Sequence, residues 1–112
     1  MNIVAVDQDE RMLMDLKEKL GNIYPGTQVK TFKNPLDVLK FAEYNEIDLL
    51  FTDVRLKPFD GYEMIRALRQ KRAFKVYIVS GSRENPDNLN WMNVNGCFSK
   101  PVTLEELKVK VG

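Results

Sequence analysis

Short apolar runs alternate with stretches of helical periodicity along this 112-residue chain, and this alternation limits the possible folds more than any other feature. The runs are rich in β-branched and aromatic residues and are too short for helices, which is typical of strands buried in a parallel sheet. The pattern predicts five strands, over residues 3–6, 29–32, 47–52, 76–79 and 97–98.

A helical pattern or a helix-start signal follows every predicted strand. Leu13, Leu16 and Leu20 are spaced by three and four residues, so an amphipathic helix is expected from about residue 9 to 22. Asn34 and Pro35 supply an N-cap and a first-turn proline to the next helix. The remaining helices are expected over residues 35–45, 61–72 and 86–92, and from 104 to the end of the chain. Five such βα units build an α/β fold, a doubly wound parallel sheet with helices on both faces.

Composition excludes several classes of protein. A formal net charge of +1 provides no basic field for nucleic acid. The chain has no histidine and one cysteine, Cys97, which excludes histidine-based catalysis, histidine metal ligands and an internal disulfide. No apolar run approaches the ~18 residues of a membrane span, and the start lacks the basic region of a signal peptide. We therefore expect one cytoplasmic domain that contacts neither nucleic acid nor membrane.

Polar residues follow four of the five predicted strands. Asp7, Asp53 and Ser80 come directly after the first, third and fourth strands, and Lys100 follows the fifth. Ligands of doubly wound sheets bind outside the carboxyl ends of the strands, so these side chains are expected at one edge. Two carboxylates about 4 Å apart repel by roughly 4 kcal/mol at an effective dielectric near 20, so the pair needs a cation, a lysine or a proton. Mg²⁺ suits such oxygen ligands, and a carboxylate beside Mg²⁺, lysine and hydroxyl can accept a phosphoryl group.

Each of these residues also has a simpler interpretation. Asp9 could be only a helix cap, and the Ser80-Gly81 pair could be only a turn. Lys100 could be an ordinary surface lysine, and Cys97 a small buried apolar residue. The four residues taken together favour a functional site over these separate structural roles.

The order and spacing of these elements resemble a response-regulator receiver domain, the CheY-like domain of two-component signalling, over essentially the whole chain. The segments that carry the resemblance are residues 6–10, 49–56, 60–61, 78–81 and 98–102. The resemblance implies a flavodoxin-like (βα)5 fold with strand order 2-1-3-4-5. It also implies phosphorylation by a partner sensor histidine kinase rather than enzymatic turnover.

The resemblance assigns a role to each site residue. Asp53 is the implied phosphoacceptor, and Asp7 and Asp53, with the backbone carbonyl of Arg55, are the implied Mg²⁺ ligands. Ser80 and Lys100 are implied to bind the phosphoryl oxygens. Phosphorylation would then change the face formed by the fourth helix, fifth strand and fifth helix. That face would control an output domain of a transcriptional, DNA-binding kind, which is expected after residue 112. The same face could alternatively control a homodimer contact.

Three positions depart from the family pattern. Gln8 replaces the second acid of the usual acidic pair, which removes a charge and should weaken Mg²⁺ binding, although the Gln8 carbonyl or Asp9 could still contribute a ligand. Lys57 stands in place of a proline, with Pro58 next to it, as in receivers joined to LytTR-type DNA-binding domains. Cys97 occupies the position of the switch aromatic, with Phe98 adjacent.

Two other functions stay open on the sequence. Gln8 is compatible with a receiver that has lost phosphorylation and acts as a constitutive interaction module. Asp7-x-Asp9, Ser80 and Lys100 also resemble the motifs of haloacid-dehalogenase-like phosphatases. Against that enzyme, Arg11 stands where a threonine or valine is expected, and Asp53 would have no role.

Overall fold

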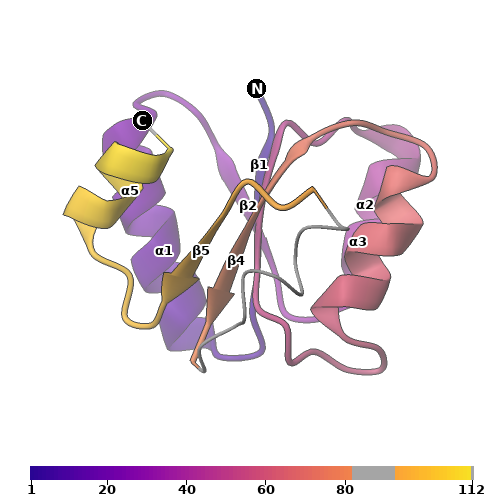
Figure 1. Cartoon of the computed structure of the whole chain (residues 1–112). Coiled ribbons are helices and arrows are strands. Elements are labelled where there is room, and N and C mark those ends of the chain that lie inside the picture. The colour runs from indigo at the N-terminus through magenta and orange to yellow at the C-terminus, as the bar shows by residue number, and fades with distance from the viewer. Residues whose placement is uncertain (82–92, 112) are drawn as a thin grey trace.

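The computed structural model describes residues 1–81 and 93–111, which form a five-stranded parallel sheet in the order β2-β1-β3-β4-β5 (Figure 1). The strands are β1 (Ile3–Val6), β2 (Val29–Phe32), β3 (Leu49–Thr52), β4 (Lys75–Ser80) and β5 (Gly96–Ser99). The fold class predicted from the sequence and the strand order implied by the family resemblance are therefore confirmed. The predicted helix over residues 86–92 lies outside the described residues.

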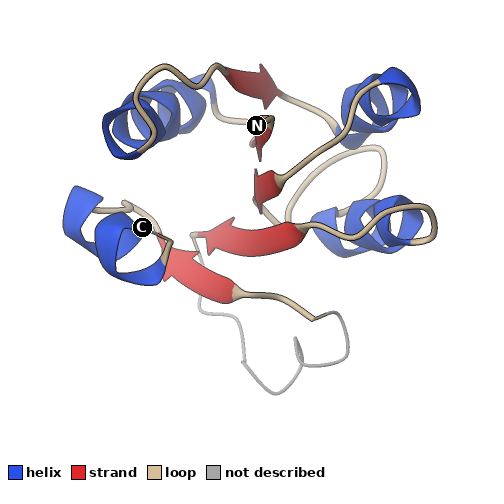
Figure 2. Cartoon of the chain, turned by 90° about the horizontal axis from the view of Figure 1, so that it is seen from above, coloured by secondary structure: helices blue, strands red, loops and turns tan. Residues whose placement is uncertain are grey.

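The described helices form a layer on each face of the sheet (Figure 2). They are α1 (Glu10–Ile23), α2 (Pro35–Tyr44), α3 (Gly61–Arg69) and α5 (Leu104–Lys110). Helices α1 and α5 cover one face over a core that includes Leu20, Phe51 and Leu107. Helices α2 and α3 cover the other face, where Leu50 and Met64 are fully buried. Because both faces are covered, the central strands are apolar without alternation.

The parallel register determines which side chains meet beyond the strand ends. Val6 of β1 pairs with Thr52 of β3, so the next residues, Asp7 and Asp53, leave the sheet side by side. The Asp53 amide donates to the Val6 carbonyl at 3.0 Å. Ser80 ends β4, and its carbonyl accepts from the amide of Lys100 at 3.0 Å. Four neighbouring strands, β1, β3, β4 and β5, therefore deliver these four residues to one edge.

Two predicted boundaries are wrong by two or three residues. Strand β3 begins at Leu49 rather than at residue 47, because Ile47 is buried in the core without belonging to the hydrogen-bonded strand. An apolar run records burial rather than strand pairing. Helix α3 ends at Arg69 rather than near residue 72, and Arg72 instead donates to the Asn45 carbonyl. The cap signals were more accurate: Asp9 and Asn34 each cap a helix with a side-chain oxygen, and Asp60 and Thr103 cap α3 and α5 in the same way.

Gly61, the first residue of α3, lies directly against the backbone of Asp53. A Cβ at this position would overlap the Asp53 carbonyl oxygen, and that oxygen also accepts from Thr52 Oγ1 at 2.9 Å. The Gly61 amide is held in turn by the Val54 carbonyl at 2.8 Å. The close approach therefore requires glycine, and it fixes the turn that carries Asp53.

We expect Gly61→Ala to lower the free energy of unfolding by about 1–3 kcal/mol, because the backbone around Asp53 must move. Urea denaturation measures this change. Gly21→Ala is the matched control, since no atom beyond its chain neighbours and the backbone of its own helix lies within 4 Å of the added Cβ, and alanine favours the helix by up to about 1 kcal/mol. Equal stability of Gly61→Ala and the wild type would show that the contact does not constrain this turn.

Candidate functional site

The structure brings Asp7, Asp53 and Lys100 into direct contact at the carboxyl ends of the strands. Lys100 Nζ lies 2.5 Å from Asp7 Oδ2 and 3.0 Å from Asp53 Oδ2. The aspartates are 6% and 8% exposed, and the lysine side chain is 16% exposed. The predicted pair of carboxylates thus exists, and its shared cation in this structure is the lysine. Ser80 is buried at the end of β4 on the same edge.

Backbone amides hold the second oxygen of each carboxylate. Asp53 Oδ1 accepts from Val54 N at 2.7 Å and, more weakly, from Arg55 N at 3.4 Å. Asp7 Oδ1 accepts from Asp9 N at 2.9 Å. These hydrogen bonds orient both carboxylates so that each Oδ2 faces the lysine. Sequence reasoning could not find them, because any residue except proline supplies a backbone amide.

The loop that carries Lys100 is tied to the rest of the molecule. Lys19 of α1 donates to the Val102 carbonyl at 2.6 Å and also pairs with Asp15 at 2.7 Å. Val102 and Leu107 pack into the core beneath α1 and α5. This anchoring fixes the chain on the far side of Lys100, so its ammonium stays directed at the carboxylates.

Gln8 bonds to the loop after β3. Its side chain is exposed, and its Nε2 donates to the backbone carbonyl of Arg55 at 2.8 Å. A carbonyl can only accept a hydrogen bond, so the NH₂ end of the amide must point at this oxygen. The Arg55 carbonyl, which the resemblance implied as a metal ligand, is therefore engaged by the protein here. Asp9 Oδ1 accepts from Arg11 N at 2.9 Å, which makes Asp9 the cap of α1 in this structure.

The electrostatics leave this site with a net negative charge. Desolvation lowers the pKa of Lys100, but hydrogen bonds to Asp7 and Asp53 and their charges outweigh it and raise the pKa above its ordinary 10.5. The lysine is therefore charged at neutral pH, and two carboxylates with one ammonium leave about −1.

The donor set fits Mg²⁺ in kind, because carboxylate and carbonyl oxygens are its usual protein ligands. Within residues 1–81 and 93–111 no group of three or more His, Cys, Asp or Glu side chains could hold a metal. An ion at this edge would therefore rely on the two carboxylates together with a backbone carbonyl and water.

Cys97 and Phe98 lie on opposite faces of β5, because successive side chains of a strand alternate. Cys97 is half-buried against the core beneath α2 and α3. Phe98 is buried on the other face, with ring centroids 6.0 Å from Tyr77 and 6.5 Å from Phe51. Phe98 therefore cannot take the place of a switch aromatic at position 97 without turning the strand over.

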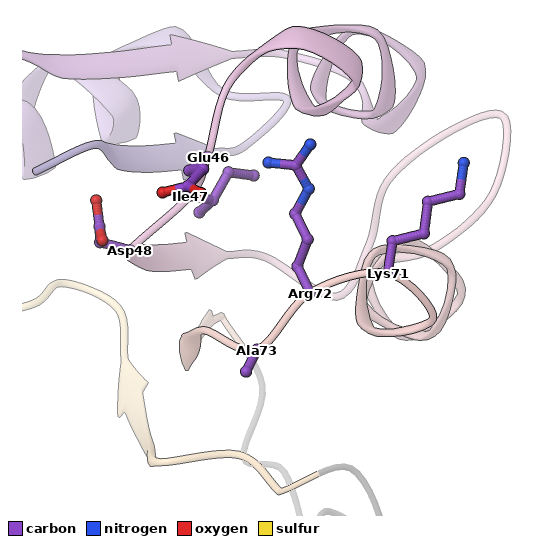
Figure 3. Close-up of a pocket in the computed structure, with 6 residues that line it drawn as sticks. All are labelled: Glu46, Ile47, Asp48, Lys71, Arg72 and Ala73. Carbon is purple, nitrogen blue, oxygen red and sulfur yellow. The ribbon is translucent and has the colours of Figure 1, made fainter.

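A cavity of about 420 Å³ lies at the opposite edge of the sheet, before β3 and β4 (Figure 3). Figure 3 shows the carboxylate of Asp48 on one side and the basic side chains of Arg72 and Lys71 on the other. Asp48 is already paired with the Asn2 amide at 2.6 Å, and Arg72 with the Asn45 carbonyl. The cavity is far along the strands from Asp53, so it is not part of the candidate site.

Comparison with protein families identifies the class to which this fold and site belong. The family model of the response regulator receiver domain matches residues 3–112, so the chain belongs to that family. Receiver domains are signalling domains of two-component systems. The resemblance drawn from the sequence is confirmed, and the phosphatase alternative is set aside. In the described part of the chain, no helix has the length and apolar character needed to cross a membrane.

Curated relatives carry this domain in different settings. The chain is 30% identical over 111 residues to the sensor histidine kinase RcsC of Escherichia coli (strain K12), covering 96% of this chain and 12% of that protein. It is 27% identical to the nisin biosynthesis regulatory protein NisR of Lactococcus lactis, covering 97% of this chain and 48% of that one. The chain thus spans an eighth to a half of these relatives.

Solved structures show the same fold. A two-component response regulator from Clostridium difficile matches with a TM-score of 0.86 at 23% identity, covering 99% of this chain and 92% of that chain. The response regulator TrrA of Thermotoga maritima, solved in complex with Mg(2+)-BeF, matches with a TM-score of 0.84 at 24% identity, covering 98% and 95%.

Proposed function

We propose that this receiver domain accepts a phosphoryl group on Asp53 from a sensor histidine kinase, with Mg²⁺ bound beside it. The observation that carries the proposal is the shared contact of Lys100 with Asp7 and Asp53 at a buried edge of the sheet. A carboxylate pair held this close, with a lysine and a buried serine on the same edge, suits the binding of a phosphoryl group better than a structural role.

Asp53 is the nucleophile in this proposal. A carboxylate oxygen of Asp53 forms a bond to phosphorus while the bond from phosphorus to the donor breaks and the donor leaves. The carboxylate is already ionised, so no base is needed, in agreement with the absence of histidine from the chain. In this proposal Lys100 neutralises the added phosphoryl charge, and the Ser80 hydroxyl donates a hydrogen bond to the phosphoryl group.

Asp7, Asp53 and the Arg55 carbonyl are the residues that would hold Mg²⁺. The bound ion would neutralise charge on the transferred oxygens. Gln8 supplies no negative charge, so we expect weaker Mg²⁺ binding than an acidic residue at this position would give.

Phosphorylation would add negative charge beside Lys100 and so change the balance around Ser80 and β5. We propose that the face containing β5 and α5 passes this change to an output domain of a transcriptional kind, or to a second copy of the chain. The similarity to NisR, a nisin biosynthesis regulatory protein, supports such an output. A LytTR-type output, suggested by Lys57 and Pro58, and a cytoplasmic location both stay predictions.

Incubation with acetyl phosphate and Mg²⁺, followed by intact mass measurement, tests the proposal. We expect the wild type to gain the mass of one phosphoryl group, and to gain none when EDTA removes the metal. An unchanged mass under conditions that label a control receiver would contradict the proposal.

One observation favours a second function, that of a constitutive interaction module. Lys100 pairs with both carboxylates, and Gln8 donates to the Arg55 carbonyl. These groups therefore have protein partners without a metal ion or a phosphoryl group. Labelling of Gln8→Asp but not of the wild type would decide for this function. Labelling of both would decide for the phosphoacceptor.

A further inference from the structure

A side-chain hydrogen bond joins the two loops that carry the carboxylates. Gln8 follows Asp7 in the loop after β1, and Arg55 lies two residues beyond Asp53 in the loop after β3. Gln8 Nε2 donates to the Arg55 carbonyl at 2.8 Å, although the two residues are 47 positions apart in the sequence. At this contact Gln8 presents the donor end of its amide, which offers no oxygen to a cation.

Protein groups also engage the other oxygens at this edge. Asp7 Oδ1 and Asp53 Oδ1 accept from the backbone amides of Asp9 and Val54, and both Oδ2 atoms face Lys100. The fifth oxygen is the Arg55 carbonyl, which accepts a hydrogen bond from Gln8. The spacing of the two loops is therefore fixed by protein donors alone, in the way that a metal ion bridging the same oxygens would fix it.

We propose that Gln8 is a positioning residue that ties these two loops together and competes with Mg²⁺ for the Arg55 carbonyl oxygen. The competition rests on the proposed function, in which that oxygen is a metal ligand. The carbonyl oxygen has two lone pairs, and the hydrogen bond from Gln8 occupies one of them and draws electron density from the oxygen. Gln8 therefore weakens the contact that Mg²⁺ can make with this oxygen, in addition to lacking a negative charge. In the metal-free protein, the same hydrogen bond holds the two loops at a fixed spacing.

Calorimetric titration of Mg²⁺ into the full chain separates this role from that of a ligand. We expect Gln8→Ala to bind Mg²⁺ about fivefold more tightly than the wild type, the factor that corresponds to one ordinary hydrogen bond. Gln8→Glu should bind more tightly still, because it removes the NH₂ group and adds a carboxylate. The expected order of affinity is glutamate, alanine, glutamine.

Thermal unfolding without Mg²⁺ gives an independent measurement. Gln8→Ala should melt about 5 °C below the wild type, because the tie between the loops is lost. Gln28→Ala is the matched control, since Gln28 is also exposed and lies outside the site, and it should leave both the melting temperature and the Mg²⁺ affinity unchanged.

The outcomes distinguish this inference from the proposed function. Weaker or equal Mg²⁺ binding by Gln8→Ala would overturn the competition, and weaker binding would make Gln8 a ligand. If no variant binds Mg²⁺, Gln8→Glu included, the proposed function fails and the competition fails with it. The tie between the loops is then decided by the melting temperature alone: a fall for Gln8→Ala supports it, and no fall overturns it.

Discussion

Asp53→Asn is expected to abolish phosphoryl uptake from acetyl phosphate while leaving the fold intact. The amide has the same size and can still accept from the amides of Val54 and Arg55, but it has no anionic oxygen to attack phosphorus. The substitution also removes one of two neighbouring negative charges, which offsets part of the lost charge-assisted bond to Lys100. We therefore expect a stability change within about 1 kcal/mol and labelling at background level.

Asp60→Asn is the matched control for this experiment. Asp60 also follows β3 in the sequence, but its Oδ1 caps α3 by accepting from Glu63 N at 2.9 Å. Asparagine caps helices about as well as aspartate, so neither stability nor labelling should change. Intact mass and peptide mapping would locate the phosphoryl group. Labelling of Asp53→Asn at the wild-type level would place the acceptor elsewhere and overturn the proposed function.

Sequence patterns predicted the architecture because a strand buried on both faces of a parallel sheet must be apolar without interruption, and such a run is visible in the sequence. Strand β1 is four apolar residues with no interruption, and all four are buried. Helix starts were equally readable, since Asn34 and Thr103 act through local hydrogen bonds to residues three positions away. The same reasoning misjudged where β3 begins and where α3 ends, because those boundaries depend on contacts with distant residues such as Asn45.

The candidate site was predictable only in part. Asp7 and Asp53 were assigned to one edge because parallel strands end together, and the register of β1 with β3 places them side by side. The pairing of Gln8 with the Arg55 carbonyl could not be predicted, since it depends on which end of an exposed amide turns toward a backbone atom. Which face of the sheet Cys97 and Phe98 each occupy depends on the register of β5, which a two-residue apolar run does not determine.

Lys100→Met should destabilise the protein by about 2–4 kcal/mol at pH 7, because it leaves two buried carboxylates without their cation. Asp7 Oδ2 and Asp53 Oδ2 lie 2.5 and 3.0 Å from the same nitrogen, so they are at most 5.5 Å apart, the sum of those distances. Two charges at that separation repel by about 3 kcal/mol at an effective dielectric of about 20. Urea denaturation measures the loss, and Lys17→Met, at an exposed position of α1, should stay within about 0.5 kcal/mol of the wild type.

A second substitution distinguishes repulsion from lost packing. Asp7→Asn removes one of the two charges, so adding it to Lys100→Met should restore about half or more of the lost stability. In the wild-type background the same substitution removes a partner of Lys100 and should destabilise. If Asp7→Asn has the same effect in both backgrounds, the loss in Lys100→Met comes from packing, and the electrostatic description of the site is wrong.

The pH dependence of this loss provides the strongest check on the charge of Lys100. Hydrogen bonds and charges from Asp7 and Asp53 outweigh desolvation and raise its pKa above 10.5, so the folded state holds this proton more tightly than the unfolded chain. A raised pKa contributes stability that is fully present below the unfolded value and is lost as pH rises through the folded value. The stability difference between wild type and Lys100→Met should therefore be constant from about pH 7 to 9 and shrink above about pH 10.5. A difference that persists undiminished in strong alkali would mean that the methylene chain of Lys100, and not its ammonium, stabilises the site.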